Sequence, residues 1–212
     1  LLGYGIALFV QPKSKKRLKL LLAFSGSFLL SLTVMHLLPE VYKSQKTSIG
    51  VFIMVGILFQ IILEFFSKGA EHGHVHGHEK IAKMPWLLFV SLCLHAFLEG
   101  FPVGHHHDLA IGIAIHHLPI AVILTTFFLH AELNKKALFL FMLTFAIMTP
   151  LGTFFSENVA FVNDYYNELT AIVIGILFHI SSTIIFESSE GHKFNIAKVS
   201  MILLGMILAY FL

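Results

Sequence analysis

Long apolar stretches separated by short polar connections make up almost all of this chain. A helix needs about 20 predominantly apolar residues to cross the hydrocarbon core of a bilayer, and fewer when it is short and packed inside a bundle. We therefore predict an all-α fold, a polytopic membrane helix bundle with eight transmembrane helices. The predicted helices are at about residues 1–11, 18–38, 49–66, 85–103, 109–130, 136–155, 168–187 and 196–212.

The chain begins inside the first apolar stretch. Its first residue is Leu1 rather than Met, and the sequence has no cleavable signal pattern. We expect that N-terminal residues are missing and that the first helix is truncated. Because most connections are short, residues 1–212 are interpreted as a single transmembrane domain, with a longer histidine-rich loop at 67–84 between the third and fourth helices.

Composition supports a membrane protein over a soluble one. Of the 212 residues, 57% are hydrophobic and only 12% are charged, and the mean hydropathy is +0.83. A soluble domain of this length has about 25% charged residues. The 22 phenylalanines fit lipid-facing helix surfaces. With a single cysteine, Cys93, the chain has no disulfide framework of its own.

The basic residues are distributed unevenly between the two alternating sets of loops. If the loop at 12–19 is cytoplasmic, the loops on its side hold 12 of the 14 lysines and arginines, and the opposite loops hold only Lys43 and Lys46. An excess of lysine and arginine marks the cytoplasmic side of a membrane protein. We therefore predict that both ends of the chain lie outside and that the 67–84 loop faces the cytoplasm. Small size and short loops favour a bacterial inner membrane.

Four residues of metal-binding types lie inside two adjacent predicted helices. His95 and Glu99 are four residues apart, so they are stacked on one helical face. His116 and His117 fall at the depth of Glu99 in the next helix, which runs in the opposite direction. These two histidines point about 100° apart, so both reach one ion only if their helix presents an edge or bends. Pro119 gives a reason for a bend, because its ring disrupts the bond to the carbonyl four residues earlier.

The chemistry of these four residues favours a divalent metal. Ionisable groups inside a bilayer are expensive and usually face a polar pathway rather than lipid. Imidazole and carboxylate together suit borderline ions such as zinc, iron, cobalt or nickel better than calcium or magnesium. The alternative is that the histidines are buried and satisfied by the backbone or by each other, which the cost of a buried carboxylate disfavours.

Four further polar residues are candidates for lining an ion pathway. His36 lies near the outer end of the second helix, where it is alternatively a histidine at a helix end in the membrane interface. His179 lies mid-span in the seventh helix among small polar residues, which are also common packing features at helix contacts. Glu64 and Glu187 lie near inner helix ends, where they either line an exit or mark the interface.

Two loops are rich in histidine. In the loop at 67–84 histidine alternates with glycine and other residues, a composition associated with metal binding. We predict a flexible cytoplasmic chelator, with a solvated loop of weak incidental affinity as the alternative. Its histidines are His72, His74, His76 and His78. A second group faces outside in the predicted topology, where it would concentrate ions at the mouth. This group is His105, His106 and His107, followed by Asp108.

Several of these motifs have the order and spacing of a known family. The first is His95-Ala96-Phe97-Leu98-Glu99-Gly100, followed by His116-His117-Leu118-Pro119. Others run from Ser25-Gly26 to Met35-His36-Leu37-Leu38-Pro39-Glu40, and along Thr149-Pro150-Leu151-Gly152. Together they resemble the ZIP family (Zrt-/Irt-like) of divalent metal transporters, in which the last two motifs would lie on the second and sixth helices. Many members also carry a histidine-bearing loop after the third helix. The resemblance covers nearly the whole chain.

The resemblance implies roles for individual residues. The four intramembrane residues would be ligands of the family's main transport site, and His36 would be an entrance or pathway residue. The chain departs from the family pattern at Ala96, where Asn is common, and at Ile120 and Ala121, where a further Glu or His is common. It also has Thr149 where some members have a carboxylate. Because these changes remove ligands of the second ion in the family's two-metal centre, we infer a single-ion site.

The resemblance also implies a function. It is the transport of a divalent transition metal into the cytoplasm by alternating access or an elevator-like motion, with zinc as the first choice and iron, manganese or cadmium next. The metal is then the transported substrate, and we expect neither a catalytic cofactor nor enzymatic activity. The expected partners are the metal ion and the lipid bilayer, with no nucleic acid and with a homodimer as a possible assembly.

Two other functions could use the same residues. An intramembrane zinc-dependent hydrolase would need three protein ligands and an open position on the metal, with Glu99 as general base. Against it, the sequence has no HExxH motif. A membrane metal sensor or structural subunit is the third alternative. Candidate ligands distributed along the pathway and over both surfaces favour transport.

Overall fold

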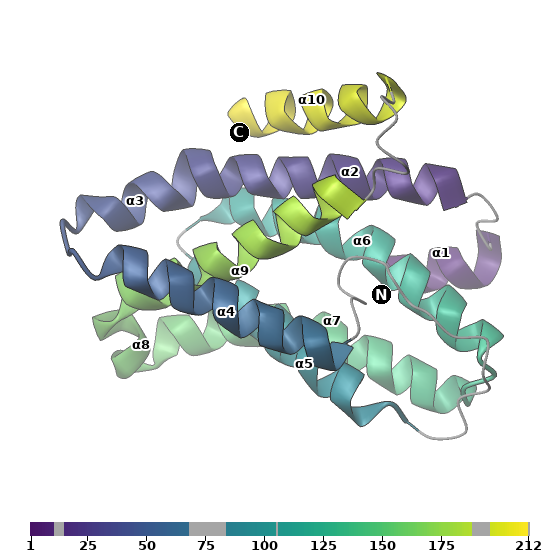
Figure 1. Cartoon of the computed structure of the whole chain (residues 1–212). Helices are drawn as coiled ribbons and strands as arrows, with labels where there is room; N and C mark the ends of the chain where they lie inside the picture. Colours follow the sequence, from purple (N-terminus) through teal and green to yellow (C-terminus); the bar gives the residue numbers. More distant parts are fainter. Residues whose placement is uncertain (11–14, 68–83, 105, 188–195, 212) are drawn as a thin grey trace.

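The computed structural model describes residues 1–10, 15–67, 84–104, 106–187 and 196–211, and no strand occurs among them. This confirms the all-α prediction (Figure 1). The elements are α1 (Leu2–Val10), α2 (Lys15–Leu32), the π-helical turn η1 (Thr33–Leu37), α3 (Leu38–Lys43), α4 (Ile49–Ser67), α5 (Trp86–Glu99), the 3-10 turn η3 (Phe101–Gly104), α6 (His107–His130), α7 (Lys135–Asn158), α8 (Ala160–Asp164), α9 (Tyr166–Glu187) and α10 (Ile196–Tyr210).

Six helical segments of the described chain are long and apolar enough to cross a membrane. They are Leu18–Lys43, Ile49–Ser67, Trp86–Gly104, Asp108–His130, Lys135–Asn158 and Tyr166–Phe186. Their outward surfaces carry large apolar side chains, for example Phe65 at 79% exposure and Leu140 at 63%. Such surfaces are stable against lipid rather than water, which supports the prediction of a membrane protein with transmembrane helices. The helices α1 and α10 are shorter, with 9 and 15 residues.

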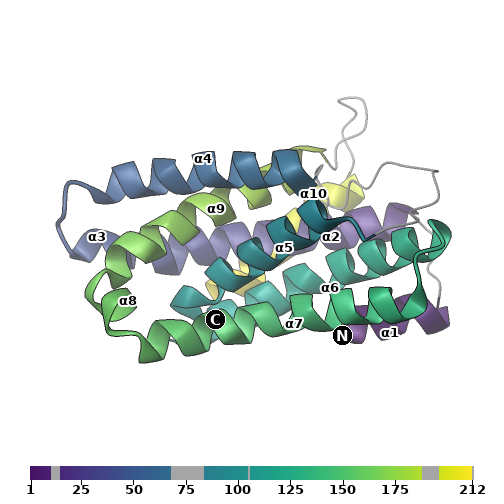
Figure 2. The same ribbon diagram turned by 90° about the horizontal axis from the view of Figure 1, so that it is seen from below.

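The helices pack closely against one another. The helix α4 lies along α9, α2 along α10, α5 along α7, and α1 along α6 (Figures 1 and 2). The helix α2 also packs against α9 and α6. It therefore contacts helices from both the middle and the end of the chain.

Glycines allow the closest of these contacts. In the α4–α9 pair, a Cβ atom added to Gly56 would collide with the carbonyl of Ile172, and one added to Gly175 would collide with the carbonyl of Ile53. Backbones approach each other this closely only where side chains are absent, which is a common way to pack helices in membranes. Gly152 has the same relation in the α5–α7 pair, where it faces the carbonyl of Phe97.

Proline and glycine interrupt two helices near the candidate site. Pro39 has no backbone N–H to donate to the carbonyl of Met35, and the helix widens into the π turn η1 over these residues. The chain nevertheless stays helical through Lys43, whereas the sequence predicted an end near residue 38. Gly100 and Pro102 follow α5, and the α-helix ends at Glu99 and continues as η3.

The helices run roughly side by side, so the molecule has two ends (Figure 1). One end holds the α3–α4 connection, α8 and η3, which packs along α7. We refer to it as the η3 end. The other end holds the turn between α6 and α7, at residues 131–134. The loop at 67–84 contains the described residues Ser67 and Met84, but its histidines lie outside the described residues.

Candidate metal centre

The buried face of α5 carries two of the predicted ligands. Its buried residues include Ser91, Leu92, His95, Ala96 and Glu99, which recur at spacings of three or four and so form one stripe. His95 is 1% exposed and Glu99 is fully buried. A carboxylate is rarely buried to this extent unless it is paired or binds a metal, because removing its charge from water is costly.

Glu99 lies between two histidine rings. Its Oε1 atom is 3.1 Å from Nε2 of His95, one turn earlier on the same helix. Its Oε2 atom is 2.9 Å from Nε2 of His117 on α6. One potential ligand atom from each of these three residues lies within 4.8 Å of the others. Two helices that are separate in the sequence therefore bring two imidazoles and one carboxylate to a common point.

The contacts of Glu99 are close but not aligned as hydrogen bonds. Neither of its oxygens, nor Nε2 of His117, has a hydrogen-bond partner of good geometry within the described ranges, although the distances are those of ion pairs. Buried polar atoms in native proteins normally have such partners. A cation between the carboxylate and the imidazole would satisfy both groups.

His116 lies beside this group but does not join it. It is fully buried, and its ring centre is 6.5 Å from that of His95 and 5.6 Å from that of His117. Its ring nitrogens are outside the group of atoms within 4.8 Å. Adjacent residues point about 100° apart on a helix, so α6 turns His117 toward Glu99 and His116 to the side. The ring of Phe145 on α7 packs against His117, with ring centres 5.1 Å apart.

Three positions at which the chain departs from the ZIP-like pattern are apolar and buried. Ala96 is fully buried, Ile120 is 1% exposed and Ala121 is 6% exposed, and all three belong to one hydrophobic core cluster. None of these side chains can ligate a metal. Thr149 lies one turn from Gly152 on α7, and its carbonyl faces Gly100.

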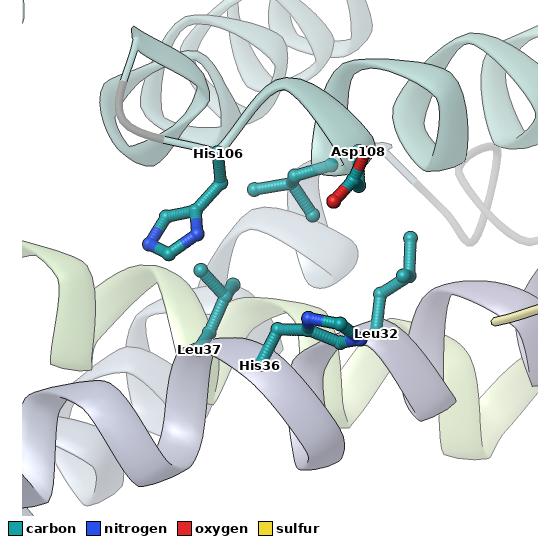
Figure 3. Close-up of a pocket in the computed structure, with 6 residues that line it drawn as sticks. Leu32, His36, Leu37, His106 and Asp108 are labelled. Carbon is teal, nitrogen blue, oxygen red and sulfur yellow. The ribbon is translucent and has the colours of Figure 1, made fainter. Parts of the chain in front are cut away.

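A second set of predicted residues meets at the η3 end. His36 on η1, together with His106 and Asp108 at the start of α6, lines a small cavity of about 10 Å³ (Figure 3). This is close to the smallest volume that holds one water molecule. Nε2 of His106 also contacts Oε2 of Glu40 on α3. His105 and the side chain of His107 lie outside the described residues.

The remaining pathway candidates lie on α4 and α9. Nε2 of His179 contacts Oε2 of Glu64, and their side chains are 19% and 27% exposed. The sequence identified both residues separately but not their contact, because nothing in the sequence relates the register of α4 to that of α9. Glu187 is the last residue of α9, and its side chain lies outside the described residues, as do His72, His74, His76 and His78.

Sequence reasoning missed two features around these residues. The contact of Glu40 with His106 joins elements more than 60 positions apart, and no local pattern signals it. Leu32 lines the small cavity beside His36, His106 and Asp108, which we call the mouth cavity. It is 1% exposed and packs against Gly112. The second feature had a partial signal, because Asp108, Gly112 and His116 recur every four residues and share one face of α6.

Comparison with protein-family models gives no match, and comparison with curated proteins gives none either. The interpretation of the site therefore rests on its residues and their geometry.

Proposed function

We propose that this protein transports a divalent transition metal ion, with zinc as the first choice, through the centre formed by His95, Glu99 and His117. The observation that carries the proposal is the convergence of these three ligands inside apolar, membrane-length helices. Ionisable groups at such a position usually mark a substrate or ion pathway. Two imidazoles and one carboxylate suit zinc and its borderline neighbours better than calcium or magnesium.

The wider arrangement supports transport in the manner of the ZIP family. The proposed bundle has eight transmembrane helices, the six long segments with the shorter α1 and α10 in addition. The proposed mechanism is alternating access, in which parts of the bundle move around a site near the middle of the membrane. The buried side chains of Ala96, Ile120 and Ala121 offer no metal ligands, so the proposed centre binds a single ion.

The distribution of basic residues gives the proposed orientation of the protein in the membrane. With the η3 end outside, 12 of the 14 lysines and arginines belong to the cytoplasmic side. Both ends of the chain would then be outside and the histidine-rich loop inside. Metal would arrive at the mouth cavity, bind at the centre and leave toward the cytoplasm, where the loop would accept or buffer it.

A transporter is preferred over the intramembrane hydrolase for a physical reason. Both would use a metal with three protein ligands, and a hydrolase would leave a fourth position open for water. A hydrolase also needs Glu99 as a general base free of the metal, whereas here Glu99 is the residue that both His95 and His117 contact. This geometry makes Glu99 the central ligand rather than a neighbouring base.

The test is zinc flux into proteoliposomes that contain the purified full chain. Wild type is compared with a His95→Ala/Glu99→Ala variant and with His130→Ala as a matched control. His130 also lies on α6, but it is exposed at the helix end and contacts the carbonyl of Thr126. The proposal predicts saturable flux in wild type and in the control, and no flux in the double variant. Tight zinc binding without flux in wild type would contradict transport and favour an enzyme or a sensor.

A further inference from the structure

The helix that carries two of the three ligands is interrupted directly after Glu99. The α-helix α5 ends there, and the chain continues as the 3-10 turn η3. Pro102 has no backbone N–H, so it cannot donate to the carbonyl of Leu98 as a continuing α-helix would require. In the hydrocarbon region of a bilayer, carbonyl groups at such a break need hydrogen-bond donors from within the protein.

Two hydroxyl groups of α7 donate to the carbonyls at this break. The hydroxyl of Thr153 donates to the carbonyl of Gly100, with 2.8 Å between the oxygen atoms. The hydroxyl of Ser156, which is 2% exposed, donates to the carbonyl of Phe101 at 2.9 Å. Thr153 and Ser156 are three residues apart, so both lie on the face of α7 that is turned toward the break.

The bond from Thr153 is the more favourable of the two. A hydroxyl has one proton, and each of these hydroxyls also lies near a carbonyl of its own helix. For Thr153 that carbonyl belongs to Thr149 and is farther away, at 3.2 Å, than the carbonyl of Gly100. For Ser156 the two acceptors are equally distant, at 2.9 Å. Thr153 therefore provides the stronger connection between α7 and the residue that follows Glu99.

Backbone packing fixes the same turn of α5 on the other side of Glu99. A Cβ atom added to Gly152 would collide with the carbonyl of Phe97, and one added to Gly100 would collide with the carbonyl of Thr149. The helix α5 lies along α7 in this region (Figure 2). The backbone of Glu99 is thus held between a contact two residues before it and a hydrogen bond one residue after it.

The position of this turn determines the geometry of the metal centre. Glu99 reaches across to His117, with 2.9 Å between Oε2 and Nε2. The helix α5 packs mainly against α7 and α4 and has little direct contact with α6. Phe145 of α7 packs against the ring of His117. The helix α7 therefore contacts both sides of the centre, and it sets the distance between the carboxylate and the imidazole.

We propose that Thr153 is a positioning residue of the metal centre, and that its bond to the carbonyl of Gly100 holds Glu99 at the distance that suits zinc. The inference rests on the metal centre of the proposed function. Selectivity between ions depends on the size and rigidity of the site as well as on its ligands. When the turn is released, Glu99 moves away from His117, and the wider site favours a larger ion such as cadmium.

The test is isothermal titration with zinc and with cadmium on the purified full chain, with the histidines of the 67–84 loop replaced by serine. Thr153→Val preserves the shape of the side chain and removes the hydroxyl. We expect the zinc affinity to fall by about tenfold or more, as for other groups that orient a metal ligand, and the cadmium affinity to fall less. The ratio of zinc to cadmium affinity therefore decreases. Thr153→Ser keeps the hydroxyl and should retain the parent ratio.

Two controls connect the ratio to the centre. Thr126→Val removes a hydroxyl that donates to the carbonyl of Val122 on its own helix, and it should leave the ratio unchanged. Glu99→Gln should abolish the tight binding, which establishes that the titration measures the centre. Ser156→Ala removes the bond one residue farther from Glu99 and should lower the ratio by a smaller factor than Thr153→Val.

Thermal unfolding distinguishes positioning from a purely structural role. A hydroxyl that only stabilises the fold would lower the Tm of Thr153→Val and leave the ratio of affinities unchanged, and this result would overturn the proposal. If Thr153→Val does not fold, an unchanged ratio in Ser156→Ala overturns it instead. If the parent chain binds no zinc, the metal centre itself fails and the positioning role with it, whereas zinc binding with an unchanged ratio rejects the positioning role alone.

Discussion

The metal centre and the mouth cavity contain the same kinds of side chain in different surroundings. At the centre, Glu99 is fully buried and the side chain of His95 is 2% exposed. At the mouth, the side chains of Glu40 and His106 are 35% and 19% exposed. Electrostatic attraction is stronger in a buried, low-dielectric site and is screened near the surface. Burial, more than residue identity, therefore separates the metal centre from the mouth cavity.

The two sites also differ in which helices they join. The centre joins α5 and α6 through Glu99, which contacts His95 on its own helix and His117 on the next. The mouth cavity lies between the continuation of α2 and the start of α6. An ion at the centre would therefore hold α5 to α6 and leave the contact between α2 and α6 unconstrained.

The largest expected effect is that of Glu99→Gln. This change keeps the size of the side chain and removes its charge and one strong metal ligand. We expect zinc affinity to fall by at least about 100-fold, since even residues that only orient a ligand contribute 10- to 100-fold. Isothermal titration with the loop histidines replaced measures the affinity, and zinc flux into proteoliposomes measures the accompanying loss of uptake. A zinc affinity within threefold of wild type would show that Glu99 is not a ligand of the centre.

The two adjacent histidines of α6 give the next prediction. His117→Ala removes a ligand in contact with Glu99 and should weaken zinc binding by roughly 10- to 100-fold. His116→Ala removes a ring that lies outside the group, so its effect should be less than about tenfold. Isothermal titration of both variants, with the loop histidines replaced, gives the two affinities. The reverse order would mean that α6 is rotated relative to the described arrangement when metal is bound.

Helix geometry explains how much of the centre the sequence predicted. The stacking of His95 and Glu99 follows from their spacing of four, and the distance of 3.1 Å between Nε2 of His95 and Oε1 of Glu99 agrees with it. The sequence could not decide between His116 and His117, because the two point in different directions and the rotation of α6 depends on packing against α5 and α7. The extension of α2 through Lys43 was missed for a related reason, since Pro39 predicts an end and the π turn absorbs it.

Contacts between distant elements were the least predictable part of the molecule. The sequence identified Glu64, His179, His36 and His106 as individual candidates. Their partners depend on which helices pair and in what register, and this depends on glycines such as Gly56 and Gly175 that let α4 and α9 approach. The six long apolar helices, in contrast, follow directly from composition and length.

A third prediction concerns the close contact between α5 and α7 that supports the metal centre. Gly152→Ala places a Cβ atom against the carbonyl of Phe97, two residues before Glu99, so α5 and α7 must move apart. We expect a loss of about 1–3 kcal/mol in stability, typical of overpacking, together with weaker zinc binding at the centre. Thermal unfolding measures the first quantity and zinc titration the second. Gly5→Ala is the matched control, because a Cβ atom there meets nothing within 4 Å.

The smallest expected effect is at the pair between α4 and α9. His179 and Glu64 contact each other, but both are partly exposed. Such pairs contribute about 0–1 kcal/mol. We expect His179→Ala to change zinc uptake by less than about fivefold, the change in rate that corresponds to about 1 kcal/mol. A loss of uptake as large as that of Glu99→Gln would show instead that this pair belongs to the ion pathway.

The most direct test of the central claim is the position of zinc bound to the full chain. Crystals of the protein grown with one equivalent of zinc would be measured at wavelengths on either side of the zinc absorption edge. The account predicts the strongest anomalous peak between Nε2 of His95, the carboxylate of Glu99 and Nε2 of His117. Zinc bound at the mouth or elsewhere, with no anomalous density among these three residues, would contradict it.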